Sequence, residues 1–300
     1  MKLLGMEFIG KVMKTALWSS ALAKPTKRVS LLFIAPFGEG KSSVVLQHRY
    51  KIARELSDCT ATGIYNLAFK AFERRKFFEY LLLPDITVIQ GKTTAAAKNL
   101  VNALNGLMEE GLATWVDPKR EIDFQEVTRD GERLRLGVIT CITNGMMQDR
   151  RQLWSVRGFL SRFLPVNFNQ SKALRSQILD FLIASDDELW EFSKDVEIKT
   201  GTQGVSVNLP EKYRPALKRL VENRYELENA YVDAVNARKS KGIRPMLSGL
   251  SDKRLTLHYK AMLRANALRH GRNTVRSRDM EFIEELDQFV SFVQAKEIGR

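Results

Sequence analysis

The fold is decided by the stretch VSLLFIAPFGEGKSS, which runs from Val29 to Ser43. It starts as an apolar run with strand character, continues through a turn that contains Gly38 and Gly40, and opens a helix that we expect to reach about Arg54. Small residues let successive backbone N–H groups turn inward around a phosphate, and the start of the following helix adds its dipole there. This order of strand, loop and helix predicts a site for the phosphates of a nucleotide.

The spacing from Ala35 to Gly40-Lys41-Ser42 fits the phosphate-loop pattern with alanine in its first position. Lys41 can reach the β- and γ-phosphates of ATP, and the Ser42 hydroxyl can ligate Mg²⁺. A chance Gly-Lys-Ser at the start of a helix is the alternative interpretation. The residues expected to bind the nucleotide are Ala35, Pro36, Phe37, Gly38, Glu39, Gly40, Lys41, Ser42 and Ser43.

A second buried strand is expected at Tyr80–Leu83, and Asp85 is the first carboxylate after it. An acidic residue at the end of a neighbouring strand usually holds the water shell of the metal in nucleotide sites, so Asp85 is the second candidate Mg²⁺ ligand beside Ser42. A plain turn residue is the alternative. Hydrolysis also needs a carboxylate to polarise the attacking water, but Ile86 follows Asp85, so the group that activates the water stays open.

Strands alternate with helices along the first half of the chain, which predicts an α/β core with a mostly parallel sheet. We place this core at residues 1–209 and a basic, helical lid domain at 210–300. The other elements expected are an amphipathic helix within 1–23, a short strand or turn at 60–69, a basic helix at 70–79, a helix from about Thr93 to Met108, a strand at Leu136–Thr143 and a basic helix at 150–164. Two hairpins are expected, one from Ile122–Val127 to Arg133–Thr143 across Asp130-Gly131, and a possible one at Val196–Val207 across Gly201–Gly204.

The composition, with 44% hydrophobic and 28% charged residues in 300, excludes a wholly disordered chain, a collagen-like repeat and a disulfide scaffold. No uncharged apolar run reaches the ~18 residues that span a bilayer, and charged residues interrupt the N-terminal apolar stretch, which favours a packed helix over a signal peptide. Cys59 and Cys141 have no metal-ligand spacing, and we interpret them as buried or half-buried thiols of a reducing, cytoplasmic compartment.

The chain carries 48 Lys and Arg against 35 Asp and Glu, a formal charge of +13, which suggests an anionic partner. Residues 211–280 hold 17 of these cations and seven anions, a difference of +10. This density suits the phosphate backbone of DNA, and because no base-reading motif is present, binding is expected to be largely independent of sequence. Solvated helix faces on a generally basic protein are the alternative.

Further segments follow the phosphate loop in a recognisable order. They are Leu81–Asp85, Leu107-Met108-Glu109-Glu110-Gly111, the hairpin at Ile122–Leu136, Gly137–Thr143 followed by Asn144, Phe159-Leu160-Ser161-Arg162-Phe163, and Lys253-Arg254-Leu255 with Val275 and Asp279. In this order the chain resembles AAA+ ATPases, and within them the helicase-like branch that includes the minichromosome maintenance (MCM) proteins. The resemblance covers about residues 1–170 and, more weakly, 245–295, whereas 171–209 has no counterpart.

The resemblance implies a AAA+ P-loop NTPase core with a C-terminal helical lid, and roles for four polar residues. Asn144 or Thr143, at the end of the sensor strand, places a polar group by the γ-phosphate and the lytic water. Arg162 is similar to an arginine finger, which reaches the site of a neighbouring subunit and neutralises charge on the γ-phosphoryl group. Arg254 looks like a lid arginine on the same phosphates.

Together these features lead us to expect an ATPase that assembles into a homo-oligomeric ring and acts on DNA as a helicase, a helicase loader or a replication remodeller. ATP and Mg²⁺ are the expected cofactors, and no membrane partner is expected. Two alternatives stay open. One is an ATP-dependent remodeller of protein partners. The other is an ATP-bound scaffold that does not hydrolyse, because Ile86 stands where the family's catalytic Glu is expected.

Overall fold

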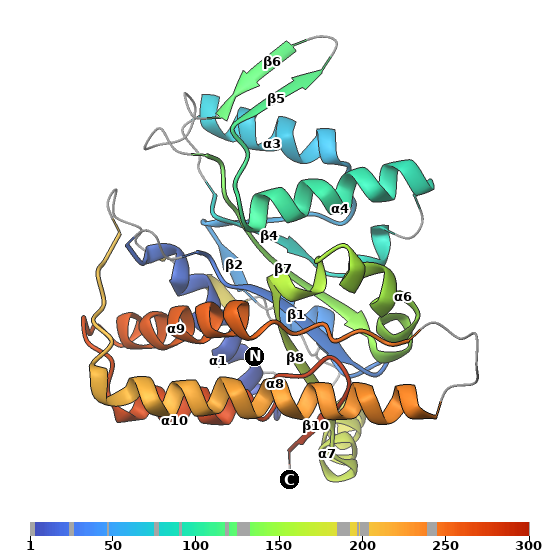
Figure 1. The fold of residues 1–300 in the computed structure, drawn as a ribbon, viewed down its shortest axis with the longest axis vertical. Coiled ribbons are helices and arrows are strands. Elements are labelled where there is room, and N and C mark those ends of the chain that lie inside the picture. Colours follow the sequence, from blue (N-terminus) through green and yellow to red (C-terminus); the bar gives the residue numbers. More distant parts are fainter. Residues whose placement is uncertain are drawn as a thin grey trace.

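A computed structural model of the chain describes residues 4–23, 27–46, 48–74, 78–89, 92–117, 120–124, 133–184, 193–196, 198, 204–238 and 245–299. Its centre is a parallel sheet of six strands in the order β10-β8-β1-β7-β4-β3 (Figure 1). The strands are β1 (Ser30–Ala35), β3 (Ala53–Glu55), β4 (Tyr80–Leu83), β7 (Gly137–Thr143), β8 (Phe163–Gln170) and β10 (Lys296–Ile298).

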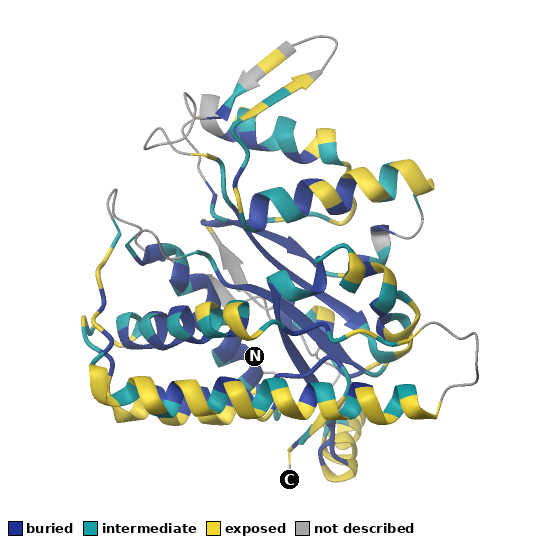
Figure 2. Ribbon diagram, viewed as in Figure 1, coloured by how far each residue is buried: buried dark blue, intermediate teal, exposed yellow. Residues whose placement is uncertain are grey.

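The sheet is covered on both faces, and every residue of β1 and β4 is buried. Near-continuous apolar strands are typical of parallel sheets with helices on both faces, and Figure 2 shows these strands as the buried centre of the molecule. The helices are α1 (Glu7–Trp18), α2 (Lys41–Leu46), α3 (Ala61–Glu73), α4 (Thr94–Met108), α6 (Asn144–Val156), α7 (Lys172–Ala184), α8 (Arg214–Ala237), α9 (Asp252–Arg269) and α10 (Ser277–Asp287). The predicted α/β class with a parallel sheet and C-terminal helices is confirmed.

The C-terminal helices α8, α9 and α10 pack on one another, and α9 also packs on α1. Beyond them, β10 adds a strand to the sheet beside β8. The division into a core at 1–209 and a lid at 210–300 stays a prediction. Within the described residues, no helix is both long enough and apolar enough to cross a membrane.

Tyr80 connects the sheet to α1. Its fully buried hydroxyl donates to the carbonyl of Ala16 at 2.6 Å and lies 2.8 Å from the hydroxyl of Ser19. Its ring lies over Gly137, where an added Cβ would fall 2.1 Å from a ring carbon of Tyr80. A side chain at position 137 would therefore displace the ring, so the β7–β4 contact requires glycine.

Three predicted elements are wrong in their extent. The helix after the phosphate loop ends at Leu46 and not near Arg54, because two three-residue strands follow, β2 (His48–Tyr50) and β3, and β3 pairs with β4. Residues 61–73 form one helix, α3, in place of a strand or turn followed by a helix. The basic helix predicted at 150–164 ends at Val156, because Phe163 already belongs to β8.

The hairpins also differ from the prediction. The hairpin of this region joins β5 (Thr114–Asp117) to β6 (Arg120–Asp123), so Ile122 pairs with Trp115. The predicted turn at Asp130-Gly131 lies outside the described residues. Near the second predicted hairpin, β9 (Ser193–Val196) pairs in parallel with β2, and Val205 bridges to Leu22. Among the described residues of this segment, the two predicted arms do not pair with each other. Residues 201–203 of that turn lie outside the described residues as well.

Candidate functional site

The polar residues predicted from the sequence gather at the two opposite edges of the sheet. Because all six strands are parallel, the loops after β1, β4, β7 and β8 leave from one edge. At this carboxyl edge lie the loop at 36–40, Asp85, Thr143 and Gln170. Arg162 precedes β8, so it lies at the amino edge. The six residues of β1 alone span about 20 Å, which no side chain crosses.

The loop between β1 and α2 has the backbone expected of a phosphate cradle. Gly38 and Gly40 have φ values of +81° and +73°, in the left-handed region that favours glycine. A Cβ at Gly38 would meet no described atom within 4 Å, so backbone conformation and not crowding requires this glycine. Phe37 is exposed at the tip of the loop.

Lys41 is buried at the start of α2, and its Nζ donates to the carbonyl oxygen of Pro36 at 2.6 Å. The ammonium group that is expected to contact a phosphate therefore binds a carbonyl oxygen of its own loop. Burial lowers the pKa of Lys41, and the neighbouring groups Cys141, Asp85 and Glu39 oppose this shift. A bound triphosphate would give the ammonium a stronger partner than a carbonyl oxygen.

Ser42 and Asp85, the two predicted Mg²⁺ ligands, come from adjacent segments. The Ser42 hydroxyl donates to the carbonyl of Pro84 at 3.2 Å, next to Asp85, which is exposed and caps the following turn through Thr87. No group of three or more His, Cys, Asp or Glu that could hold a metal occurs in the described part of the chain. A Mg²⁺ ion at this place would therefore take one hydroxyl and one carboxylate, with water and phosphate completing its shell.

Cys141 contributes to this edge, which the sequence did not reveal. Its Sγ lies 3.6 Å from the Ser42 hydroxyl and 2.5 Å from the carbonyl oxygen of Pro84. Burial raises its pKa to about 11, so it stays a thiol at neutral pH and is no nucleophile. Both cysteines are buried and free, as predicted.

Thr143 and Asn144 lie beside the start of the loop, because Thr143 pairs with Ala35 in the sheet. The Thr143 hydroxyl accepts from the backbone N–H of Met146 at 3.4 Å and so caps α6. The Oδ1 atom of Asn144 is buried and has no hydrogen-bond partner among the described residues. A buried, unsatisfied amide oxygen is costly in a native structure, and a bound water or ligand would satisfy it. Ile86 is fully buried and offers no group to polarise water.

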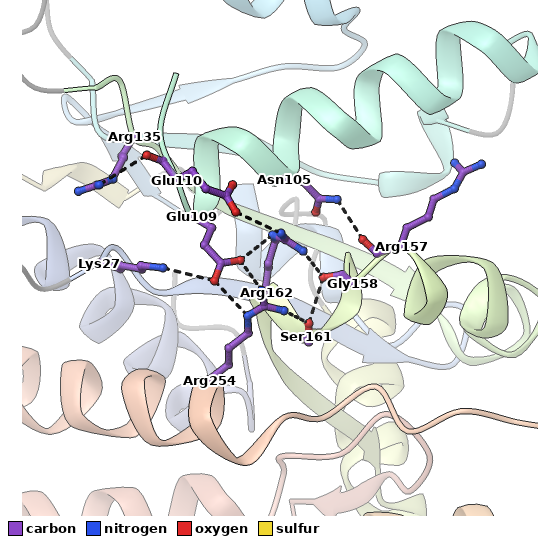
Figure 3. A network of polar contacts seen from close by, with 10 residues as sticks. All are labelled: Lys27, Asn105, Glu109, Glu110, Arg135, Arg157, Gly158, Ser161, Arg162 and Arg254. Atoms are coloured by element: carbon purple, nitrogen blue, oxygen red, sulfur yellow. Dashed lines mark hydrogen bonds and ion pairs between the residues drawn. The ribbon is translucent and has the colours of Figure 1, made fainter. Parts of the chain in front are cut away.

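At the amino edge, Glu109 collects three cations (Figure 3). Its carboxylate lies 2.9 Å from Nε of Arg162, 2.5 Å from Nη2 of Arg254 and 3.4 Å from Nζ of Lys27. Arg254 also contacts the hydroxyl of Ser161. We call Glu109, Lys27, Arg162 and Arg254 the arginine cluster. It brings together the two arginines predicted to act on one set of phosphates, and it adds Glu109, which the sequence did not assign to them.

The pKa values of Glu109 and Arg162 in the arginine cluster, and of the adjacent His258, are shifted from their usual values. Burial alone would raise the pKa of Glu109, but Arg254, Arg162 and Lys27 outweigh it and the net shift is downward. Burial lowers the pKa of Arg162 despite the nearby carboxylate. Burial, with the charges of Arg254 and Lys27, lowers the pKa of His258 to about 4, so this imidazole is neutral at pH 7.

A cavity of about 190 Å³ opens beside the arginine cluster. Its charged lining consists of six cations and one carboxylate, which are Lys27, Arg28, Arg162, Arg254, Lys260, Arg264 and Glu109. Arg28 is paired outside this set, with Glu79. One carboxylate does not neutralise six cations, so the net positive charge of the lining favours an anion in this cavity.

The basic C-terminal region is partly neutralised within the fold. Ion pairs join Arg224 to Asp287 and Arg272 to Asp279, at 2.8 and 2.7 Å. Lys239, Lys241 and Arg244, three of the 17 cations counted in residues 211–280, lie outside the described residues. Some of the positive charge counted from the sequence therefore stabilises helix packing.

No family model matches the sequence, and no curated protein matches it. Among solved structures, the chain is similar to a full-length MCM homologue from Methanopyrus kandleri, with a TM-score of 0.50 and 14% sequence identity. The match covers 98% of this chain and 57% of that one, so the chain spans little more than half the length of the structure that it matches. At this identity the likeness shows the fold alone.

Proposed function

We propose that the chain is a AAA+-type ATPase that binds MgATP at its carboxyl-edge loop and completes the ATP site of a neighbouring copy with its arginine cluster. The observation that carries this proposal is the separation of the two groups. Lys41, Ser42 and Asp85 lie at one edge of a parallel sheet, and Arg162 and Arg254 lie at the other. Such a distribution suits subunits that share sites across their interfaces.

Four features support the binding of MgATP at the loop. The two glycines with positive φ leave room for phosphates, and Lys41 is placed to exchange a carbonyl partner for a phosphate. Ser42 is adjacent to Asp85, as a shared Mg²⁺ requires. The unsatisfied Oδ1 of Asn144, next to the loop, favours Asn144 over Thr143 as the group that faces the γ-phosphate or the lytic water. MgATP supplies the phosphoryl group and its counter-ion, and the chain's own residues hold and orient them.

The arginine cluster supports a site shared between copies. Arg162 and Arg254 are too far from Lys41 of the same chain to meet its phosphates. The carboxylate of Glu109, with that of Glu110 at 3.8 Å from Arg162, faces two arginines and a lysine. Two carboxylates do not balance three cations, so positive charge remains for a phosphate from outside. In this arrangement Arg162 neutralises charge that develops on the γ-phosphoryl group of the neighbour, and repetition of the contact closes a homo-oligomeric ring.

Hydrolysis is expected to be slow. Ile86 is fully buried at the position where a carboxylate would activate water. This observation favours the second candidate, an ATP-bound scaffold in which nucleotide stabilises the assembly without rapid turnover. A turnover near zero with tight ATP binding selects that candidate.

DNA is the proposed macromolecular partner, on the strength of the +13 charge and the basic 211–280 region. Binding would be dominated by phosphate contacts and would weaken steeply with salt. ATPase rates with and without single- and double-stranded DNA test this part, because a remodeller of protein partners would not be stimulated by DNA.

The first prediction tests nucleotide binding. Lys41→Ala removes the ammonium that is placed for the β- and γ-phosphates, so MgATP affinity should fall by about 100-fold or more while the circular dichroism spectrum is unchanged. Lys218→Ala is the matched control, since Lys218 is 75% exposed on α8 and pairs only with Glu222 among the described residues. Titration calorimetry measures both. Equal MgATP affinity in wild type and Lys41→Ala would overturn the proposed function.

A further inference from the structure

Glu39 is an unusual residue for a phosphate loop. It lies one residue before Gly40-Lys41, and its side chain is buried, with 4% of the residue exposed. A carboxylate in a loop that surrounds a triphosphate repels the ligand unless another group neutralises it, and a buried unpaired carboxylate is itself costly. The loop therefore requires a partner for Glu39.

Both carboxylate oxygens of Glu39 are occupied. One accepts the backbone N–H of Gln170 at 2.5 Å, and the other lies 2.6 Å from Nη2 of Arg175. The backbone carbonyl of Glu39 accepts from the side-chain amide of Gln170 at 3.4 Å. The carboxylate is thus turned toward the end of β8 and the start of α7, and it anchors the loop there.

Arg175 lies on α7, near the start of the stretch 171–209. This stretch has no counterpart in the family that the sequence resembles. The first turn of α7 is fixed to the end of β10: the hydroxyl of Ser171 donates to the carbonyl of Gly299 at 2.7 Å, and the backbone N–H of Arg175 donates to the carbonyl of Ser171. Leu174 is buried against Gly299, where an added Cβ would fall 2.6 Å from it. The guanidinium therefore leaves from a fixed backbone.

We propose that Arg175 is a positioning residue of the phosphate loop. It neutralises Glu39 and holds the loop against the end of β8, with its glycines free to surround the phosphates. This inference rests on the proposed function, and it assigns to α7 a part in nucleotide affinity. In this role Arg175 acts through Glu39, so its removal alters affinity for MgATP and not the chemistry of the γ-phosphoryl group.

A half-exposed arginine does not by itself make a strong ion pair. The side chain of Arg175 is 52% exposed, and surface pairs usually contribute little. Here the other member is buried, with 5% of its side chain exposed, so loss of Arg175 leaves a carboxylate without its counter-charge inside the loop. The effect on MgATP comes from that carboxylate, and it disappears when the carboxylate is replaced by an amide of the same shape.

Titration calorimetry of MgATP against single and double variants tests this coupling. Arg175→Ala should raise the Kd about tenfold, and Arg175→Lys, which keeps the charge, should recover most of the affinity. In the Glu39→Gln background, Arg175→Ala should change the Kd less than about twofold, because the substituted amide carries no charge to neutralise. Lys172→Ala, which removes an exposed cation from the same helix, is the control and should leave the Kd unchanged.

The possible results separate cleanly. An Arg175→Ala variant that binds MgATP as tightly as wild type overturns this inference and leaves the proposed function standing. The same tenfold loss with and without Glu39→Gln also overturns it, because the arginine would then act on the fold and not through the carboxylate. A wild-type chain that binds no MgATP overturns the proposed function and this inference together.

Discussion

Glu109 forms more ion pairs than any other carboxylate described at the amino edge. One side chain, 20% exposed, faces three cations that arrive from the ends of different elements. A carboxylate shared in this way loses less conformational freedom per ion pair than an isolated pair, because one side chain is fixed once for several partners. The three cations lower the pKa of Glu109 by more than burial raises it.

The second prediction follows from the sign of that shift. A folded-state pKa below the unfolded value of about 4.3 means that Glu109 stabilises the fold above that pH, and that this contribution is lost as the pH falls through the lower, folded-state pKa. Glu109→Gln should lower the free energy of unfolding by about 1 kcal/mol at pH 7. The difference from wild type should shrink as the pH is lowered from about 5 to 3.

Urea denaturation across this pH range measures the effect. Glu222→Gln is the control, because Glu222 is 52% exposed and pairs with Lys218 alone among the described residues. A Glu109→Gln difference that stays constant down to pH 3 would contradict the ionic explanation and point to lost packing.

At the residue scale, the sequence offers local patterns for candidate residues at the carboxyl edge but few at the amino edge. Lys41, Ser42 and Asp85 sit in short local patterns at strand ends, where the chemistry follows from spacing alone. The partners Glu109 and Arg175 could not be found in this way, because each meets its charge through the tertiary fold and has no periodic signal of its own. Arg162 and Arg254 were found only through the resemblance.

At the scale of elements, a buried ion pair joins α6 to α8. Arg151 and Glu228 have side chains 3% and 1% exposed, with Nη2 and Oε1 2.5 Å apart. Two further hydrogen bonds reach the pair: Nε of Arg151 donates to the carbonyl of Leu247 at 3.0 Å, and the Ser291 hydroxyl donates to Glu228 at 3.1 Å. Four segments are therefore fixed relative to one another by one pair.

The third prediction concerns this pair. Removing one partner leaves a buried charge without compensation, so Arg151→Met should lower the free energy of unfolding by about 3–5 kcal/mol. The double variant Arg151→Met with Glu228→Leu should be clearly more stable than the sum of the two single losses predicts, because neither charge remains. Chemical denaturation of the four proteins gives the coupling. Additive losses would show that the two side chains act independently.

Elements with strong apolar patterns were predicted well, and short ones were not. The strands β1, β4 and β7 are buried runs bounded by turn residues, and α4 has a clear helical period. The three-residue β3 has no such signal, and its conformation comes from pairing with β4. Ile122 lies in a strand as expected, but it pairs with Trp115, which precedes it in the chain, whereas the sequence favoured a partner after the Asp-Gly pair.

At the scale of the whole molecule, the two edges of the sheet give the fourth prediction. If Arg162 acts on a neighbour, Arg162→Ala should leave MgATP binding nearly intact but slow hydrolysis by the assembly about 10³-fold. Lys41→Ala subunits have an intact arginine cluster, and Arg162→Ala subunits have an intact loop. Mixing the two should therefore restore hydrolysis wherever they adjoin in the productive order.

Arg157→Ala is the control for this experiment, because its side chain points away from Glu109 in Figure 3. It should hydrolyse ATP like the wild type. Phosphate release at several mixing ratios and protein concentrations measures the recovery. An Arg162→Ala variant as active as wild type, with turnover independent of concentration, would remove the shared-site mechanism.

The position of β10 beside β8 has a consequence for how the protein is made. The ribosome synthesises β8 well before β10 and α1 long before α9, yet each pair is in contact in the finished fold. A nascent chain that has just released β8 presents the unpaired backbone of Phe168–Gln170 and the bare apolar face of α1. These contacts therefore form only after β10 and α9 have been synthesised, and until then the open edge of β8 is able to pair with another chain.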